Sequence, residues 1–305
     1  MDAPIDFSFP PIRQLHDDRT RRIRKVTRQR TDPAGPAGTF SATDYCLAHH
    51  VMEGAETAAR AGDKASFGWY RERPDAGAAT HAIPTDAGPR VIVSPVRELI
   101  SQPGISETPY YVLGPETTSA PQLLLTLAAG AFAAGNRAGF GDLLSAHAVV
   151  VCLLHEKEPG KPLHSWTISR LPGTIFCDYT AHAAVLGRDL VHEAAHNWLN
   201  DALTATKSLP GSEEPEFFSP WKNAMRPAYG FLHACWAFPL MMLYTARVIN
   251  DSAAGEATPF LSAYLDRQRP LLAAATKDHE TALGLVTDPG LRQRLHTARD
   301  LAAAL

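Results

Sequence analysis

The chain has 305 residues, of which 45% are hydrophobic and 20% are charged, and its formal net charge is −3. These values belong to globular proteins, and they exclude a wholly disordered or a fibrous chain. A chain of this length folds as one large domain or two small ones and buries enough surface to need no disulfide support.

Other simple features narrow the class of protein further. The longest apolar run, residues 123–134, is interrupted by Thr126 and Gly130, and it falls short of the roughly 20 residues that span a membrane. Residues 1–6 are acidic and lack the apolar segment of a signal peptide. We therefore expect a cytoplasmic protein without membrane contact. Its cysteines show no CxxC spacing and should be free thiols in a reducing compartment; they are Cys46, Cys152, Cys177 and Cys235.

The first 40 residues are predicted to form a basic N-terminal arm and a linker. Residues 1–30 hold eight Lys and Arg against four Asp, and residues 32–38 read Asp-Pro-Ala-Gly-Pro-Ala-Gly, which is typical of a linker. The favoured interpretation is a solvated helix or arm; docking of an acidic leader peptide or of nucleic acid is the alternative. Nothing in the net charge of the whole chain calls for nucleic acid. Residues 41–305 are predicted to form a single helix-rich, metal-binding catalytic domain.

Two serines mark predicted helix starts in the first half of this domain. Ser41 can cap a helix whose apolar residues share one face, and Ser119 precedes an apolar helix with Pro121 in its first turn. Between them lie two short β-branched or aromatic runs that favour strands. The predicted elements are helices at 42–61 and 121–134 and strands at 91–93 and 110–113.

The second half changes from strands to long helices. The run at 147–154 (HAVVVCLL), followed by 165–169 and 174–177, predicts a small antiparallel β-meander. Pro239 and Pro270 fall inside helical patterns and should kink or split them. The expected fold class is therefore α+β and helix-rich, with a small meander followed by long helices. These helices are predicted at 182–204, 227–249, 258–276 and 278–304.

One motif in the first of these helices carries chemistry: His192-Glu193-Ala194-Ala195-His196. Histidines four residues apart project from the same face of a helix, so their imidazoles can chelate one transition metal. Glu193 is rotated about 100° from His192 and can flank a metal-bound water or serve as an outer group. The HExxH motif therefore predicts a metal site, and the alternative is two core or surface histidines with a structural glutamate.

The motif does not by itself identify the third ligand. Leu199 and Ala202 stand where a metzincin needs glycine and histidine, which excludes that class. A thermolysin-like site needs a glutamate on a following helix. Three candidates lie 17 to 20 residues after His196, but prolines and a glycine punctuate residues 210–220, which predicts a solvated loop. These candidates are Glu213, Glu214 and Glu216.

His233 is the other candidate for the third ligand. Pro227 can open a helix that is apolar on nearly all sides, which indicates a buried helix. A histidine in such a helix needs a partner, because an unpaired buried polar group costs roughly 2–7 kcal/mol. Arg226 would lie about two turns before His233 and could clamp a carboxylate bidentately; an ion pair with a nearby glutamate is its alternative role.

Residues 183–240 resemble the HExxH family of peptide-modification proteins, some of which are iron(II)- and 2-oxoglutarate-dependent peptide β-hydroxylases. The resemblance rests on four segments in fixed order: LVHEAAHNWLN at 190–200, SPWK at 219–222, RP at 226–227 and GFLHA at 230–234. It implies iron held by His192, His196 and His233, with Arg226 binding the 2-oxoglutarate carboxylate. Lys222 departs from the arginine that often follows SPW, which weakens a bidentate role there.

Three functions are compatible with these residues. The first is an iron(II)/2-oxoglutarate-dependent dioxygenase that hydroxylates the β-carbon of an amino acid, in a peptide or in a free or carrier-bound amino acid. The second is a zinc metallopeptidase in which Glu193 is the general base and Glu216 or a neighbour is the third ligand. The third is a non-catalytic binding protein that retains the two histidines. We predict the first.

Overall fold

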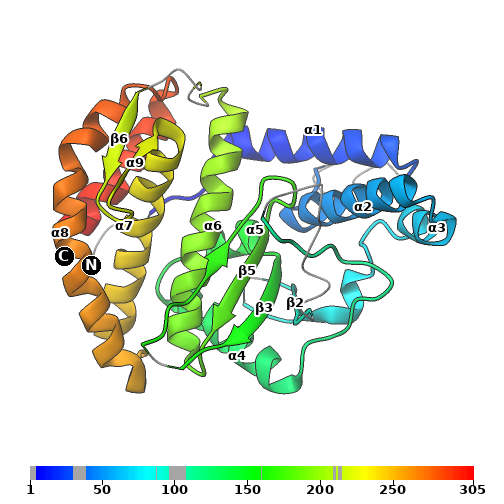
Figure 1. Ribbon diagram of the computed structural model, residues 1–305, viewed down its shortest axis with the longest axis horizontal. Helices are drawn as coiled ribbons and strands as arrows, with labels where there is room; N and C mark the ends of the chain where they lie inside the picture. Colours follow the sequence, from blue (N-terminus) through cyan, green and yellow to red (C-terminus); the bar gives the residue numbers. More distant parts are fainter. Residues whose placement is uncertain are drawn as a thin grey trace.

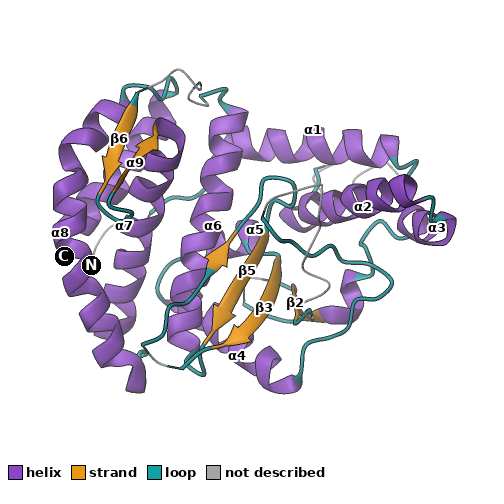
Figure 2. Ribbon diagram, in the orientation of Figure 1, coloured by secondary structure: helices purple, strands orange, loops and turns teal. Residues whose placement is uncertain are grey.

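The computed structural model describes residues 5–29, 39–86, 88–95, 108–158, 160–208, 211 and 215–305. Within these ranges the chain forms nine α-helices and a small mixed sheet, so the expected helix-rich α+β class is confirmed. Figure 2 shows the helices surrounding the strands. The linker expected at 32–38 lies outside the described residues, and the predicted division at residue 40 stays a prediction.

The larger sheet has the strand order β1-β2-β3-β5-β4. β3 pairs in parallel with both β2 and β5, whereas β4 pairs antiparallel with β5 and β1 antiparallel with β2. The predicted antiparallel meander is therefore wrong for its central strands. The continuous apolar run of β3 fits this position, because strands in the middle of a parallel sheet are buried on both faces. The strands are β1 (Ala82–Ile83), β2 (Arg90–Val93), β3 (Val150–Glu156), β4 (Ser165–Trp166) and β5 (Thr174–Tyr179).

Before β3, the helices predicted at 42–61 and 121–134 and the strand predicted at 91–93 are present, whereas the helices at 64–72 and 141–147 were not predicted. Ser41 caps α2, as the sequence indicated, and Asp44 completes a capping box with it. Pro121, not Ser119, is the N-cap of α4, while the Ser119 hydroxyl contacts His81. The strand predicted at 110–113 is absent among the described residues. The helices here are α1 (Pro10–Val26), α2 (Ala42–Ala61), α3 (Lys64–Glu72), α4 (Gln122–Arg137) and α5 (Gly141–His147), with a 3-10 turn, η1 (Ala78–His81).

The basic N-terminal segment is a helix with a buried face. α1 packs against α2 and α6, as Figure 1 shows, and Ile12 and His16 are among its buried residues. Phe7, just before the helix, lies in the core, and its carbonyl accepts a hydrogen bond from the Trp198 indole at 3.0 Å. The solvated helix or arm expected here therefore describes only the outer face of α1.

The C-terminal half is a helical layer beside the sheet. A hairpin of β6 and β7 occupies part of the segment predicted as a loop. Pro239 and Pro270 both lie inside uninterrupted helices, so the predicted breaks do not occur there. The elements are α6 (Ala183–Ala205), β6 (Glu216–Ser219), β7 (Ala224–Pro227), α7 (Ala228–Asn250), η3 (Gly255–Ala257), α8 (Thr258–Leu283) and α9 (Pro289–Ala303).

α6 is the central helix of the molecule. It lies between α4 and α7 and contacts the sheet through β5 (Figure 1). Close approach is possible at Gly187, where an added Cβ would lie 2.3 Å from the Tyr244 hydroxyl oxygen and 3.0 Å from the Ala131 carbonyl oxygen. α7 is long and apolar enough to cross a membrane, but 78% of its apolar window is buried within the protein. Its apolar character is therefore accounted for by packing in the core.

Candidate metal centre

α6 holds two histidines side by side at the interface with α7. The Nε2 atoms of His192 and His196 are 3.1 Å apart, as expected for residues one turn apart on a single helical face. The Phe238 ring of α7 lies 5.1 Å from the His192 ring, centroid to centroid. The Phe238 ring in turn stacks on Trp221 at 4.8 Å. The His192 imidazole therefore lies against an aromatic wall formed by Phe238 and Trp221.

His233 reaches this pair from α7. Its Nδ1 atom lies 3.0 Å from Nδ1 of His196, on the opposite side of that ring from His192. The Tyr229 ring packs on His233 with centroids 4.5 Å apart. Because one imidazole gives only one nitrogen to a given ion, His233 joins an ion bound by the two Nε2 atoms only after its ring, or that of His196, turns. The structure thus brings the three predicted ligands together without aiming all of them at one point.

Glu193 is the acidic group nearest to the histidines. His192, Glu193 and His196 offer ligand atoms that all lie within 4.8 Å of one another. The Glu193 Oε1 atom is 4.0 Å from His192 Nε2 and accepts a hydrogen bond of 2.7 Å from the Ser165 hydroxyl. Two imidazoles and a carboxylate form a donor set suited to zinc or to iron(II). The hydrogen bond from Ser165 therefore fixes the carboxylate oxygen that faces His192.

The surroundings keep the imidazoles neutral. Burial lowers the pKa of all three histidines, for His196 to about 4, and neighbouring positive groups add to the effect on His192 and His196. A neutral imidazole has the lone pair that a metal needs. His192 Nδ1 and His233 Nε2 are inaccessible to water and make no hydrogen bond. The neutral rings and the unpartnered His233 Nε2 fit a bound metal ion, which would offset the cost of burying that nitrogen; His192 Nδ1 is not the nitrogen that faces His196.

The two predicted carboxylate-binding cations differ in their relation to the site. The charge of Lys222 lowers the pKa of His192, Glu193 and His196, and Lys222 follows Trp221, whose ring stacks on Phe238. Arg226 is exposed on β7, and its guanidinium lies over Gly230, where an added Cβ would be 3.0 Å from Nη2. The sequence ranked Arg226 first, whereas the electrostatics favour Lys222; the role of Arg226 stays a prediction.

Glu216, the alternative third ligand, lies on the β6–β7 hairpin. It is exposed and pairs with Pro227 across the hairpin. Among the residues that the structure describes, no hydrogen bond or ion pair joins Glu216 to the histidines. Glu213 and Glu214 lie outside the described residues. The position of Glu216 therefore gives no support to a thermolysin-like ligand set.

Two neighbours of the motif were not anticipated. Ser165 lies in β4, at the edge of the sheet, and no local pattern links it to Glu193. Arg188 lies one turn before His192 on α6, and its charge contributes to the lowered pKa of that histidine. The spacing of four residues could have identified Arg188, because residues at i and i+4 are neighbours on a helix.

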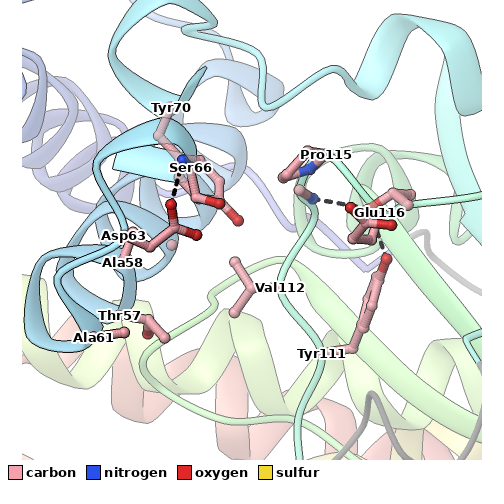
Figure 3. A pocket seen from close by; sticks show the side chains of 13 residues that line it. Thr57, Ala58, Ala61, Asp63, Ser66, Tyr70, Tyr111, Val112, Pro115 and Glu116 are labelled. Atoms are coloured by element: carbon pink, nitrogen blue, oxygen red, sulfur yellow. Dashed lines mark hydrogen bonds between the residues drawn. The ribbon is translucent and has the colours of Figure 1, made fainter. Parts of the chain in front are cut away.

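A separate cavity of about 270 Å³ lies between α2, α3 and the segment around residues 110–117. Asp63 and Glu116 lie on opposite sides of it, with Val112 between them (Figure 3). The Asp63 carboxylate already accepts a hydrogen bond from the Ser66 backbone at 3.0 Å. None of the HExxH residues lines this cavity, so it is a separate feature from the metal centre.

Comparison with models of known protein families found no match, and a search of curated proteins found no relative. The function is therefore inferred from the geometry of the metal centre. The metal centre combines neutral imidazoles, one buried carboxyl group and one nearby ammonium group within an aromatic wall.

The pH dependence of stability should report the environment of Glu193. Burial raises the pKa of its carboxyl group from 4.5 to about 8, so in the metal-free protein the folded state holds a proton that the unfolded state releases. The contribution of Glu193 to the free energy of unfolding should fall as pH rises from 4.5 towards 8, by an amount on the order of 5 kcal/mol. Glu193→Gln cannot titrate and should lose this decline.

Urea denaturation of the metal-free protein at pH 5 and pH 9 measures this effect. The Gln variant should gain stability relative to the wild type between the two pH values. Glu280→Gln, at a glutamate whose side chain is 61% exposed, is the matched control and should follow the wild type. Parallel pH profiles for Glu193→Gln and the wild type would show that the folded state does not hold this proton.

Proposed function

We propose that the protein is an iron(II)- and 2-oxoglutarate-dependent dioxygenase, with the metal held by His192, His196 and His233. The observation that carries the proposal is the contact of three largely buried, neutral imidazoles across the α6–α7 interface. Three protein ligands leave open positions on an octahedral iron, which oxygenases require. The resemblance of residues 183–240 to HExxH-type β-hydroxylases supports the same reaction.

The proposed reaction inserts one oxygen atom of O₂ into a C–H bond at the β-carbon of an amino acid. The other oxygen atom enters succinate, which forms with CO₂ as 2-oxoglutarate is oxidised. Iron(II) supplies the redox chemistry that zinc lacks. The substrate is a peptide, or a free or carrier-bound amino acid, and the proposed location is the cytoplasm.

The chain's own residues bind and position the reactants. Lys222 is the proposed partner of one 2-oxoglutarate carboxylate, with Arg226 as a second cation on the same hairpin. Trp221 and Phe238 stack beside His192 and exclude water from that side. Glu193, fixed by Ser165, holds a proton or a negative charge next to His192. Such positioning matters, because a displacement of about 1 Å can reduce a rate roughly a hundredfold.

A zinc metallopeptidase is the second candidate, and one observation favours it. The Glu193 carboxyl group lies beside the two histidines, where a general base of an HExxH peptidase would act. The predicted third ligand of that site, Glu216, is exposed on its hairpin and makes no described contact with the histidines. The oxygenase is therefore the better supported of the two.

Anaerobic addition of iron(II) and 2-oxoglutarate to the protein tests the proposal. A weak visible charge-transfer band should develop, and succinate should form once O₂ and a substrate are present. His233→Ala should weaken iron binding by more than the roughly 10- to 100-fold that partners outside the ligand shell contribute, whereas Glu216→Ala should leave it unchanged. Loss of metal binding in Glu216→Ala, with normal binding in His233→Ala, would instead establish the peptidase ligand set.

A further inference from the structure

A cavity of about 530 Å³ lies between α6, α7, α8 and the loop after β3, and Arg188 of α6 is among its lining residues. Its walls come from α6, α7, α8 and the loop between β3 and β4, which contribute Arg188, Met241, Tyr264 and Lys161. Arg188 lies one helical turn before His192, and Met241 lies one turn after Phe238, which packs on His192. The cavity is therefore a neighbour of the histidines along both helices.

Arg188 is a buried cation that its neighbours hold in place in the lining of this cavity. Its side chain is only 7% exposed, and its Nε and Nη2 atoms lie 2.9 and 2.8 Å from Oδ1 of Asp189. The rings of Phe260 and Tyr264 flank the guanidinium at 5.2 and 5.0 Å, a cation–π arrangement. These contacts fix the planar group in one orientation while leaving Nη1 outside the ion pair. A preorganised guanidinium of this kind suits a carboxylate.

Two more cations line the cavity without an opposing charge. Lys161 and Arg267 make no ion pair within the part of the chain that the structure describes, and no described acidic side chain lines the cavity. Asp189 neutralises Arg188, so the remaining net charge of the lining is about +2. The Tyr264 hydroxyl donates a hydrogen bond to the thioether sulfur of Met241 at 3.0 Å, and that sulfur is a weak acceptor. An anionic group with a carbon skeleton would satisfy both the charges and the apolar walls.

We propose that this cavity binds the carboxylate of a small organic acid, held by Arg188, Lys161 and Arg267. The carboxylate belongs to a free dicarboxylic acid or to an acidic amino-acid side chain, which share this chemistry. Its assignment to a reactant of the neighbouring metal centre rests on the proposed function, whereas the binding itself does not. The proposed ligand of this cavity is therefore an acidic molecule.

Calorimetric titration of the metal-free, full-length protein tests the proposal with succinate, N-acetyl-aspartate amide and inorganic phosphate as probes. We expect at least one of the two carboxylates to bind more tightly than phosphate, and the affinity to fall as salt rises. Tighter binding of succinate would identify a free dicarboxylic acid as the ligand, and tighter binding of N-acetyl-aspartate amide would identify an acidic amino-acid side chain. The double variant Lys161→Ala/Arg267→Ala should weaken that binding about tenfold. Arg188→Lys keeps the charge but loses the planar fork, and it should also bind about tenfold more weakly.

Arg269→Ala is the matched control, because Arg269 lies on α8 two residues from Arg267 but lines a different cavity. Its affinity should equal that of the wild type. Equal binding of phosphate and both carboxylates, or unchanged binding in the double variant, would overturn the proposal. Iron binding is measured on the same variants and should be unaffected. Failure of the iron site with intact carboxylate binding would therefore count against the proposed function alone.

Discussion

Replacing either histidine of the HExxH motif by alanine should abolish metal binding. His192 and His196 supply the two nitrogens that lie 3.1 Å apart, and the loss of either breaks the chelate that one helical turn provides. We expect the dissociation constant for iron(II) to rise by at least about 100-fold, since even partners outside the ligand shell contribute 10- to 100-fold. Anaerobic equilibrium dialysis measures the change directly.

The matched control is His296→Ala. His296 lies on α9 with a side chain that is 45% exposed, and it pairs with Asp300. Its removal should leave iron binding unchanged. Both HExxH variants should keep the helical circular dichroism of the wild type, which separates loss of the site from loss of the fold. Stoichiometric iron in either variant would contradict the assignment of these ligands.

The second large effect concerns Asp201, which joins the N-terminal helix to α6. Its Oδ2 atom lies 2.8 Å from His16 and 3.7 Å from His147, and the Tyr45 hydroxyl donates to Oδ1 at 3.1 Å. All four groups are buried. Asp201→Ala should lower the free energy of unfolding by about 3–5 kcal/mol, because it leaves the partners of a buried charge unpaired. Urea denaturation at pH 7 measures the loss.

The free energy of unfolding at low pH should also depend on the contacts of Asp201. Burial acts to raise the pKa of Asp201, but the hydrogen bond from His16 and the charges of His16 and His147 bring it below 3.8. A lowered pKa contributes stability above pH 3.8 that is lost as pH falls through the folded-state value. Asp201→Ala should lack this component of the acid transition. Asp266→Ala, at an exposed ion pair with Arg269, should change stability by less than about 1 kcal/mol.

The helices α2, α6 and α7 could be predicted because their signals are local, whereas the break predicted at residue 277 is wrong, because α8 continues to Leu283. The capping box of Ser41 and Asp44 and the apolar periodicity after it determine the start of α2. The same periodicity identified α6 and α7 within one residue at each end. The HExxH pair followed from α6 alone, because residues at i and i+4 of one helix are neighbours whatever the rest of the fold does.

Features that depend on distant parts of the chain were not predictable in this way. The parallel pairing of β3 with β2 and β5 depends on which segments meet in space, and strand patterns alone do not encode it. The contact between Ser165 and Glu193 has the same origin, since β4 approaches α6 only in the folded sheet. Pro239 is accommodated inside α7 by tertiary packing, which overrides its local preference.

The orientation of His233 is the feature on which the proposed function most depends. The sequence placed this residue on the correct helix, and the structure brings its Nδ1 to 3.0 Å from His196. Which nitrogens face a common ion is set by ring rotations that no sequence pattern determines. The choice between His233 and Glu193 as the third donor is therefore a question about the metal-bound protein.

X-ray absorption at the iron K-edge of the anaerobically loaded protein answers that question most directly. We expect three imidazoles in the first coordination shell of the iron in the wild-type protein, and two imidazoles in His233→Ala. Two imidazoles in the wild-type protein, with the spectrum unchanged by His233→Ala, would contradict the three-histidine iron centre.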